Sequence, residues 1–327
     1  MILIISCVED VHVLPVTRHL DEMAVPYKRI DPAASEQSFF EIKTGRGRYQ
    51  SSISGSRRDT IALARSTVIW YRRPTSPGQL PERYLPDILK YVNSNRRAAY
   101  FGLLHQLPCD WLPATPMVHD LAGNKTYQLS VANELGFFIP LTRISAAPEA
   151  LLEMYSRSRN GIVIKSLMPF VDSEHKTMVF TRTVDRRELR RYLGIRYAPV
   201  IIQERIEKRS ELRITVVGEE VFAAEIHSQA NSRARIDFRR ASHEIEHRVH
   251  KLPAAVAKRC VDLTRQLGLR FAAIDMILTP EGKYVFLEIN PNGQWLWIEN
   301  ATGLPIAEAI ARLLAECHSK RKQQRSR

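Results

Sequence analysis

The sequence predicts an α/β fold with two unequal parts, an N-terminal open α/β unit and a larger C-terminal part of antiparallel strands with covering helices. Strand-like and helix-like segments alternate over about the first 115 residues, which is the order of βαβ units. Two hairpin patterns and three amphipathic segments follow in the second part. We therefore expect domains over residues 1–115 and 116–318, with a basic tail over 319–327.

The elements of the first part follow from apolar runs and helical periodicity. Alternation and β-branched content favour strands, and a period of 3.6 residues favours helices. The expected elements are a strand over residues 2–8, a helix over 13–24, a strand over 67–74, a helix over 86–107 and a proline-punctuated linker over 109–120.

The second part has longer elements and clearer turns. Gly136 suits the end of a helix because glycine adopts the left-handed backbone that a helix C-terminus requires. The expected elements are a helix over residues 121–137, strands over 161–167 and 199–206, a hairpin over 211–229, a helix over 254–269, a hairpin over 271–290 and a helix over 304–318.

Composition limits the class of protein. Of the 327 residues, 44% are hydrophobic and 25% are charged, as in ordinary globular proteins. Four scattered cysteines, with no CxxC pair, argue against a disulfide framework and a structural zinc, and they favour a reducing cytosol. The apolar run at the N-terminus is too short for a signal peptide or a membrane span, and no segment approaches twenty apolar residues. We expect a cytoplasmic protein with no membrane partner.

The net charge of +13 is the main oddity of the composition. Such a charge suits nucleic acid, an acidic peptide or a ligand that carries phosphate. The tail KRKQQRSR supplies part of it, and most such tails are simply solvated. Outside the tail, no basic run is interleaved with aromatic residues, so nucleic acid is the less favoured partner.

The segment FLEIN, residues 286–290, places two polar side chains on one face of an apolar strand. Glu288 and Asn290 share a face because strand side chains alternate. If Glu281-Gly282 forms a two-residue turn, Asp275 lies directly opposite Glu288, and a bulge would shift this register by one residue. Oxygen ligands of this kind favour Mg²⁺ or Mn²⁺. The alternative is a cluster paired with arginine or lysine at the end of a sheet.

Four further side chains could serve a phosphate ligand. Lys165 follows three apolar residues in a strand, where an unpaired ammonium is costly to bury, although its head could also reach solvent. Lys125 begins a helix, where a lysine is usually solvated. Glu211 and Arg213 share one face of a strand, as an acid for ribose hydroxyls and an arginine for phosphate would, or as an ordinary ion pair does.

Together these residues resemble the ATP-grasp superfamily, in order, over most of residues 116–315. The resemblance implies a lid subdomain over about 145–205 and ATP and Mg²⁺ as cofactors, with Mn²⁺ as an alternative to Mg²⁺. It implies phosphate contacts from Lys125 and Lys165, ribose binding by Glu211, and catalytic roles for Arg213 and Lys165. Arg213 matches an arginine of a D/E-x-R pattern seen in members that modify peptides, and it is also expected to contact the nucleotide. The implied adenine hinge is Gln203, Glu204, Arg205 and Ile206, and the implied metal ligands are Asp275, Glu288 and Asn290.

One loop departs from the pattern of that superfamily. Many members cover the phosphates with a glycine-rich loop after the lid lysine, whereas residues 166–180 contain no glycine. The contacts of this loop with phosphate are therefore not predicted.

Three segments, WYRRP, SRARIDFRR and FLEINPNGQWLWIENATG, resemble the graspetide ligases, the maturases of microviridin-type peptides. This resemblance implies a ligase that activates Asp or Glu side chains of a ribosomal precursor peptide as acyl phosphates and joins them to Thr or Ser hydroxyls or Lys amines. It also implies a leader-binding region near residues 212–240 and a possible homodimer. The candidate peptide contacts are Arg72, Arg73, Arg235, Asp237 and Arg239.

Two other functions stay open at the level of sequence. One is an ATP-grasp amino-acid or glutamate ligase that acts on a small molecule or a protein tail. The other is a non-catalytic basic module that binds peptide or nucleic acid.

Overall fold

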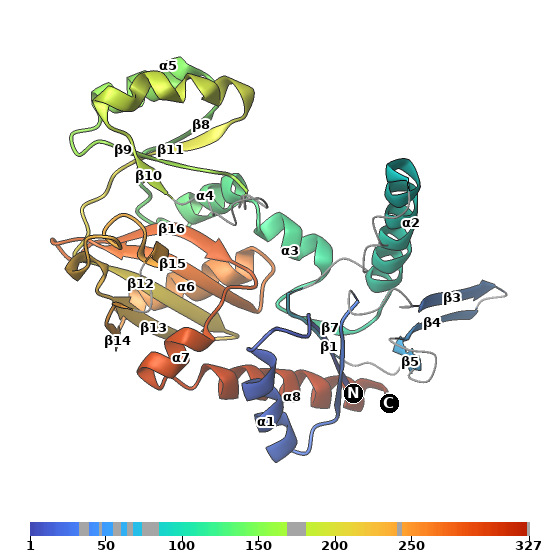
Figure 1. Cartoon of the computed structure of the whole chain (residues 1–327). Helices are drawn as coiled ribbons and strands as arrows, with labels where there is room; N and C mark the ends of the chain where they lie inside the picture. Colours follow the sequence, from blue (N-terminus) through green and yellow to red (C-terminus); the bar gives the residue numbers. More distant parts are fainter. Residues whose placement is uncertain are drawn as a thin grey trace.

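A computed structural model describes most of the chain. The described residues are 1–32, 39–45, 48–54, 60–63, 68–73, 85–168, 181–240 and 244–325. In Figure 1, a small sheet with helix α5 (Pro148–Arg157) projects at the top, and helix α2 (Pro86–His105) and strands β3–β5 (residues 39–62) lie at the right.

The N-terminal sheet has four parallel strands in the order β2-β1-β6-β7. Its central strand β1 is fully buried, which explains the uninterrupted apolar run in the sequence. Helices α1 and α8 (Ile306–Arg325) pack against one face of this sheet, and α2 packs against the other. The bounds are β1 Ile2–Ile5, α1 Val13–Glu22, β2 Tyr27–Ile30, β6 Val68–Tyr71, α2 Pro86–His105 and β7 Asp110–Leu112.

A separate antiparallel sheet is inserted between β2 and β6. Its order is β3-β4-β5, with bounds β3 Phe39–Gly45, β4 Arg48–Ser54 and β5 Thr60–Ala62. No strand was expected over these residues.

The small sheet has the order β10-β9-β11-β8, and the pairs in it are antiparallel. Helix α5 and the 3₁₀ segment η2 cover its apolar side through a cluster that includes Leu151, Met154 and Ile202. The bounds are β8 Thr142–Ser145, α5 Pro148–Arg157, β9 Ile162–Lys165, β10 Arg182–Thr183, η2 Arg186–Tyr197 and β11 Val200–Glu204.

The large sheet has five antiparallel strands in the order β14-β13-β12-β15-β16. Helices α4 and α6 pack on one face, and α7 and α8 lie on the other, so α8 contributes to the cores of both the large and the N-terminal sheets. The bounds are α4 Lys125–Glu134, β12 Ser210–Val217, β13 Glu220–Ile226, β14 His247–Val249, α6 Ala254–Gln266, β15 Phe271–Leu278, β16 Tyr284–Asn290, α7 Leu296–Thr302 and α8 Ile306–Arg325; two 3₁₀ turns, η3 Ser228–Ala230 and η4 Phe238–Arg240, follow β13.

Three expectations from the sequence need correction. The expected linker over 109–120 holds strand β7, which extends the N-terminal sheet, and the start of helix α3, Pro116–Ala122. The helix expected over 121–137 breaks at Asn124, whose side chain accepts hydrogen bonds from the backbone N–H groups of Thr126 and Tyr127 and so caps α4. The last helix, expected to end at residue 318, continues as α8 to Arg325.

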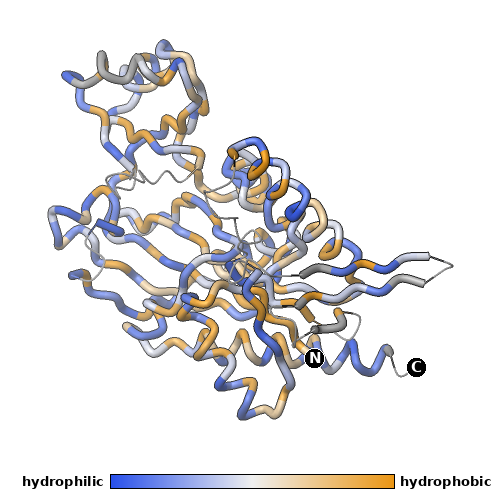
Figure 2. Tube along the Cα trace, turned by 45° about the vertical axis from the view of Figure 1, so that its right-hand side comes forward, coloured by the Kyte–Doolittle hydropathy of each residue, from blue (hydrophilic) through white to orange (hydrophobic). Residues whose placement is uncertain are grey.

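Hydrophobic segments run through the central strands, and hydrophilic segments prevail toward the end of α8 (Figure 2). Within the described ranges, none of the helices is long and apolar enough to cross a membrane.

Candidate functional site

A row of charged side chains crosses the large sheet from β12 to β16. Arg213 is the register partner of Asp275, which is in turn the partner of Glu288. Directly opposite residues on adjacent strands share a face, so the three side chains lie side by side. The predicted pairing of Asp275 with Glu288 is confirmed.

The turn that produces this pairing differs from the expected one. Thr279 N–H donates to Lys283 O at 3.0 Å, so three residues, not two, lie in the turn, and Gly282 adopts a left-handed φ of +81°. The register near the turn is therefore displaced by one residue, and a bulge between Asp275 and Met276 restores it.

Arg213 holds Asp275 with one nitrogen. Its Nη1 lies 2.8 Å and 3.0 Å from the two carboxylate oxygens of Asp275, while its Nη2 donates to Gln294 O at 2.8 Å. Burial and the neighbouring charge of Glu288 raise the pKa of Asp275, and the guanidinium of Arg213 opposes this rise. Asp275 is thus a desolvated carboxylate that a cation would stabilise.

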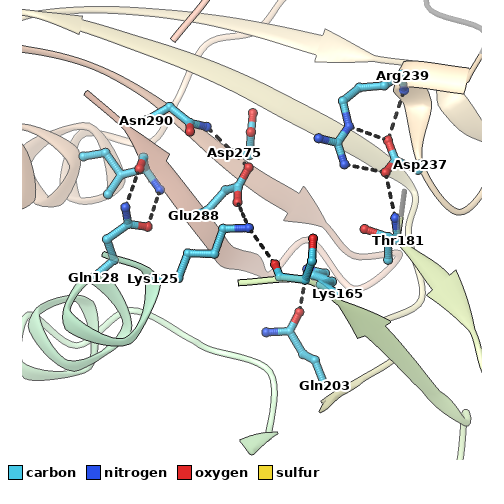
Figure 3. A network of polar contacts seen from close by, with 12 residues as sticks. Lys125, Gln128, Lys165, Thr181, Gln203, Asp237, Arg239, Asp275, Glu288 and Asn290 are labelled. Atoms are coloured by element: carbon cyan, nitrogen blue, oxygen red, sulfur yellow. Dashed lines mark hydrogen bonds and ion pairs between the residues drawn. The ribbon is translucent and has the colours of Figure 1, made fainter. Parts of the chain in front are cut away.

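Glu288 lies on strand β16, and its side chain faces the start of α4. Its Oε2 is 3.4 Å from Lys125 Nζ, and its Oε1 accepts from Asn290 Nδ2 at 3.3 Å (Figure 3). Burial acts to raise the pKa of Glu288, but the charges of Lys125 and Lys165 outweigh it and hold that pKa below its usual range. The lysines expected to hold phosphate therefore converge on this carboxylate.

Lys165 reaches the same site from strand β9 of the small sheet. Its Nζ donates to Gln203 Oε1 at 2.7 Å, and Gln203 Nε2 donates to Thr142 Oγ1 at 2.9 Å. Burial lowers the pKa of Lys165 to about 8, with Lys125 adding to the effect and Glu288 opposing it. An ammonium in this state gains from an anionic ligand.

Two more carboxylates flank the site. Glu211 pairs with Lys208, and burial raises its pKa despite that partner. Asp237 accepts from Arg239 Nε at 2.8 Å and from Arg239 Nη2 at 2.5 Å, and it also accepts from Thr181 N–H at 3.3 Å. The contact with Thr181 ties the loop after β13 to the segment that enters β10 (Figure 3).

The four residues expected to contact adenine, 203–206, lie at the point where strand β11 ends. Gln203 is buried, Glu204 and Ile206 are half-buried, and Arg205 is exposed. The backbone N–H groups of Glu204 and Arg205 donate to Leu141 O and Gly161 O, which fixes the path of the chain as it leaves the small sheet. Of the glycine-free loop, residues 169–180 lie outside the described residues.

The expected peptide contacts occupy different environments. Arg73, Arg235 and Arg239 are exposed, whereas Asp237 is buried beneath Arg239. Arg72 has a relative exposure of 1%, and its Nη1 donates to Asn292 O at 2.7 Å and to Gly293 O at 3.2 Å. The structure thus places Arg72 in the interior, against the protein's own backbone, instead of on a surface open to a peptide.

Gln128 is a site residue that the sequence reasoning missed. From its place on α4, one turn after Lys125, its Nε2 donates to Ile289 O at 2.7 Å and its Oε1 accepts from Ile289 N–H at 3.2 Å. The side chain is 3% exposed, and it fixes the first turn of α4 beside Glu288 and Asn290. The available signal was its helical spacing from the apolar residues Val131 and Ala132, which places this glutamine on the apolar face of the helix. The sequence could not show what it contacts.

The donor set fits a magnesium ion. Two adjacent carboxylates and an amide offer hard oxygen ligands on one face of the sheet, and a rotation of the Asn290 amide turns its oxygen toward Glu288. The raised pKa of Asp275 marks the charge that such a cation would neutralise. Asp275, Glu288 and Asn290 are the residues that could hold it.

Lys125 from α4 and Lys165 from the small sheet thus face two carboxylates on the β15–β16 pair of the large sheet, an arrangement that suits a phosphate ligand with its metal ion. Residues 122–314 match the RimK-like ATP-grasp domain, and the chain belongs to this ATP-grasp family. Members use ATP and Mg²⁺, so an ATP-dependent ligase activity follows from the family.

Three proteins illustrate the similarity. The macrocyclase MdnC of Microcystis aeruginosa MRC, solved with its precursor peptide MdnA, is 30% identical with a TM-score of 0.86, covering 96% of this chain and 99% of that one. The RiPP-associated ATP-grasp ligase of Chryseobacterium gregarium, solved with ADP and a leader and core peptide, is 28% identical with a TM-score of 0.88, covering 96% of each chain. A probable alpha-L-glutamate ligase 2 of Shewanella baltica (strain OS195) is 24% identical over 205 residues, which are 62% of this chain and 66% of that ligase.

Proposed function

We propose that this protein is an ATP-dependent peptide macrocyclase that forms ω-esters or ω-amides within a ribosomally made precursor peptide. The observation that supports it is the extent of the similarity. MdnC superposes on 96% of this chain with a TM-score of 0.86 and 30% identity, whereas the glutamate ligase is 24% identical over the 62% of the chain that its sequence matches. The higher identity favours a precursor peptide over free glutamate as the substrate.

The proposed reaction has two steps. A side-chain carboxylate oxygen of Asp or Glu in the peptide attacks the γ-phosphorus of ATP, and ADP leaves. A Thr or Ser hydroxyl or a Lys amine of the same peptide then attacks the acyl carbon, loses its proton, and phosphate leaves. Each linkage therefore removes one water from the peptide.

The described side chains suit both steps. Lys125 and Lys165 face the site from α4 and β9, where they can meet the phosphates of ATP and the charge that develops on the transferred group. Arg213, fixed by Asp275 and Gln294 O, presents a guanidinium to the same region. Mg²⁺ held by Asp275, Glu288 and Asn290 would supply charge to the phosphates. No described group is required as a nucleophile.

The nucleotide and the peptide are proposed to bind on either side of this centre. Glu211 is the candidate for the ribose hydroxyls, and the backbone from Gln203 to Ile206 is the candidate for adenine. Arg73, Arg235 and Arg239 are exposed and could contact an acidic peptide, since the chain carries a net charge of +13.

Mass spectrometry tests the proposal directly. The protein is incubated with ATP, Mg²⁺ and a candidate precursor peptide rich in Thr or Ser and in Asp or Glu. Loss of the mass of one water per linkage, dependent on ATP, supports the macrocyclase. The Glu288→Gln variant is the matched control, because it keeps the shape of the side chain and removes its charge.

A second candidate is a ligase that adds glutamate to a small molecule or a protein tail, which the match to the glutamate ligase favours. The same experiment separates the two. Addition of one residue's mass in the presence of free glutamate would support this second function and contradict macrocyclisation.

A further inference from the structure

The loop that follows Asn290, residues 291–295, is held at four of its backbone groups by side chains from elsewhere. Arg72 donates to Asn292 O and Gly293 O, and Arg213 donates to Gln294 O at 2.8 Å. The N–H of Trp295 donates to His12 Nε2 at 3.4 Å. Two of these three side chains, Arg72 and His12, come from the N-terminal sheet and its connections.

Arg72 and His12 are themselves fixed by one buried carboxylate. Asp10 Oδ2 lies 3.3 Å from Arg72 Nε and accepts from Ser6 Oγ at 2.8 Å, while Asp10 Oδ1 contacts His12 Nδ1 at 2.9 Å. Burial lowers the pKa of His12, so the imidazole is neutral at pH 7. With Nδ1–H donating to Asp10, Nε2 is free to accept from Trp295.

The loop has no room for a side chain at its centre. A Cβ on Gly293 would lie 2.3 Å from Ala273 Cβ and 2.8 Å from Arg213 Nη2. The N–H of Gly293 also donates to Asn290 O at 3.1 Å. The position of this loop therefore sets both the guanidinium of Arg213 and the backbone of Asn290.

We infer that Arg72 is a positioning residue for the phosphoryl-transfer centre, acting through the backbone of residues 292–294 on Arg213 and Asn290. The inference rests on the proposed roles of Arg213, Asp275 and Asn290. It makes the N-terminal sheet a part of the reacting centre in addition to any role in binding peptide. Burial lowers the pKa of Arg72 to about 10, so the guanidinium stays charged at pH 7 and can keep its ion pair with Asp10.

The test is Arg72→Lys, with Arg29→Lys as the matched control. An ammonium keeps the charge but cannot face Asp10 and two carbonyls at once, because it lacks the planar fork of arginine. Arg29 is also an arginine of the N-terminal sheet that donates to backbone carbonyls, those of Cys7 and Val8, but it lies outside the contacts to the loop.

The readout is the affinity for ADP by calorimetry, with Mg²⁺ and with EDTA, beside a thermal unfolding curve. Mg²⁺ is expected to raise the affinity of the wild type for ADP. In Arg72→Lys this increase should be about tenfold smaller, a loss of the size seen when a group that orients a metal ligand is removed. The affinity in EDTA is expected to stay unchanged, and Arg29→Lys is expected to match the wild type in both. A lower Tm with an unchanged Mg²⁺ gain would show a structural role only and overturn the inference.

A double-mutant cycle gives a second readout. If Arg72 acts through Arg213, adding Arg72→Lys to Arg213→Lys reduces the Mg²⁺ gain little further, whereas independent roles give additive losses and contradict the inference. Should Arg72→Lys fail to fold, Asp10→Asn replaces it, with a smaller loss expected and no loss as the contrary result. These measurements need no peptide, so they stand even if the wild-type protein dehydrates no peptide and the proposed function fails.

Discussion

Lys165 is expected to lower the stability of the nucleotide-free protein, and its replacement by methionine should raise it. The pKa of this lysine falls from 10.5 to about 8 on folding. At about 1.4 kcal/mol per pKa unit, holding the charged ammonium in the folded chain costs about 3 kcal/mol at pH 7. The Lys165→Met substitution removes this cost but deprives Gln203 Oε1 of its donor, a loss of about 1 kcal/mol. The net expectation is a gain of about 2 kcal/mol in the free energy of unfolding.

The stability cost of burying the charge of Lys165 depends on pH. Below about pH 8 the lysine is protonated in both the folded and the unfolded chain, so the folded protein bears the full cost. Between the folded pKa of about 8 and the unfolded pKa of 10.5, Lys165 loses its proton in the folded chain first. The cost of burying its charge therefore falls to zero over this range. The advantage of Lys165→Met should therefore be largest at pH 7 and shrink as the pH rises above 8.

Urea unfolding at pH 7 and pH 9, with and without ATP and Mg²⁺, measures both halves of this prediction. Nucleotide should stabilise the wild type much more than the variant, because the phosphates compensate the charge of Lys165. The reasoning is refuted if Lys165→Met is less stable than the wild type at pH 7 without nucleotide. It is equally refuted if the difference between the two proteins is the same at both pH values.

Three further outcomes can be measured on the same protein. Asp275→Asn and Glu288→Gln should each abolish ATP-dependent dehydration of the peptide in mass spectrometry, and full activity in either variant would rule out the proposed metal ligands. The apparent KM for ATP should rise above about pH 8, where Lys165 loses its proton, and Lys165→Arg should flatten that profile. Gly293→Ala should lower the free energy of unfolding by about 3 kcal/mol through overpacking, while Gly102→Ala, a helical position with nothing within 4 Å, should leave it equal or raise it by about 1 kcal/mol.

The sequence predicted the strands of the site well because their apolar runs are long and their turns carry clear signals. The pairing of Asp275 with Glu288 was predicted correctly, but the turn was not. A three-residue turn and a bulge replace the expected two-residue turn. A bulge is difficult to predict from one sequence because it depends on packing against neighbouring strands. The agreement in register thus came from two deviations of opposite effect.

The roles of Arg72 and Gln128 could not be predicted from the sequence. Both are polar residues in ordinary sequence settings, and each acquires its role from backbone groups more than 150 positions away in the chain. Arg72 was expected to contact a peptide because the segment WYRRP resembles the graspetide ligases. Only the packing of the N-terminal sheet against the loop at 291–295 reveals that it is interior.

Strand β16 carries two of the candidate metal ligands, and it lies at the edge of its sheet. An open edge can accept a strand from another chain, which would distort the site and invite aggregation. Here Gln128 pairs with both backbone groups of Ile289, and Phe138 O accepts from Phe286 N–H at 2.8 Å. A single side chain and a short extended segment thus stand in for a sixth strand, and they deny this edge to any foreign strand, including an extended substrate peptide.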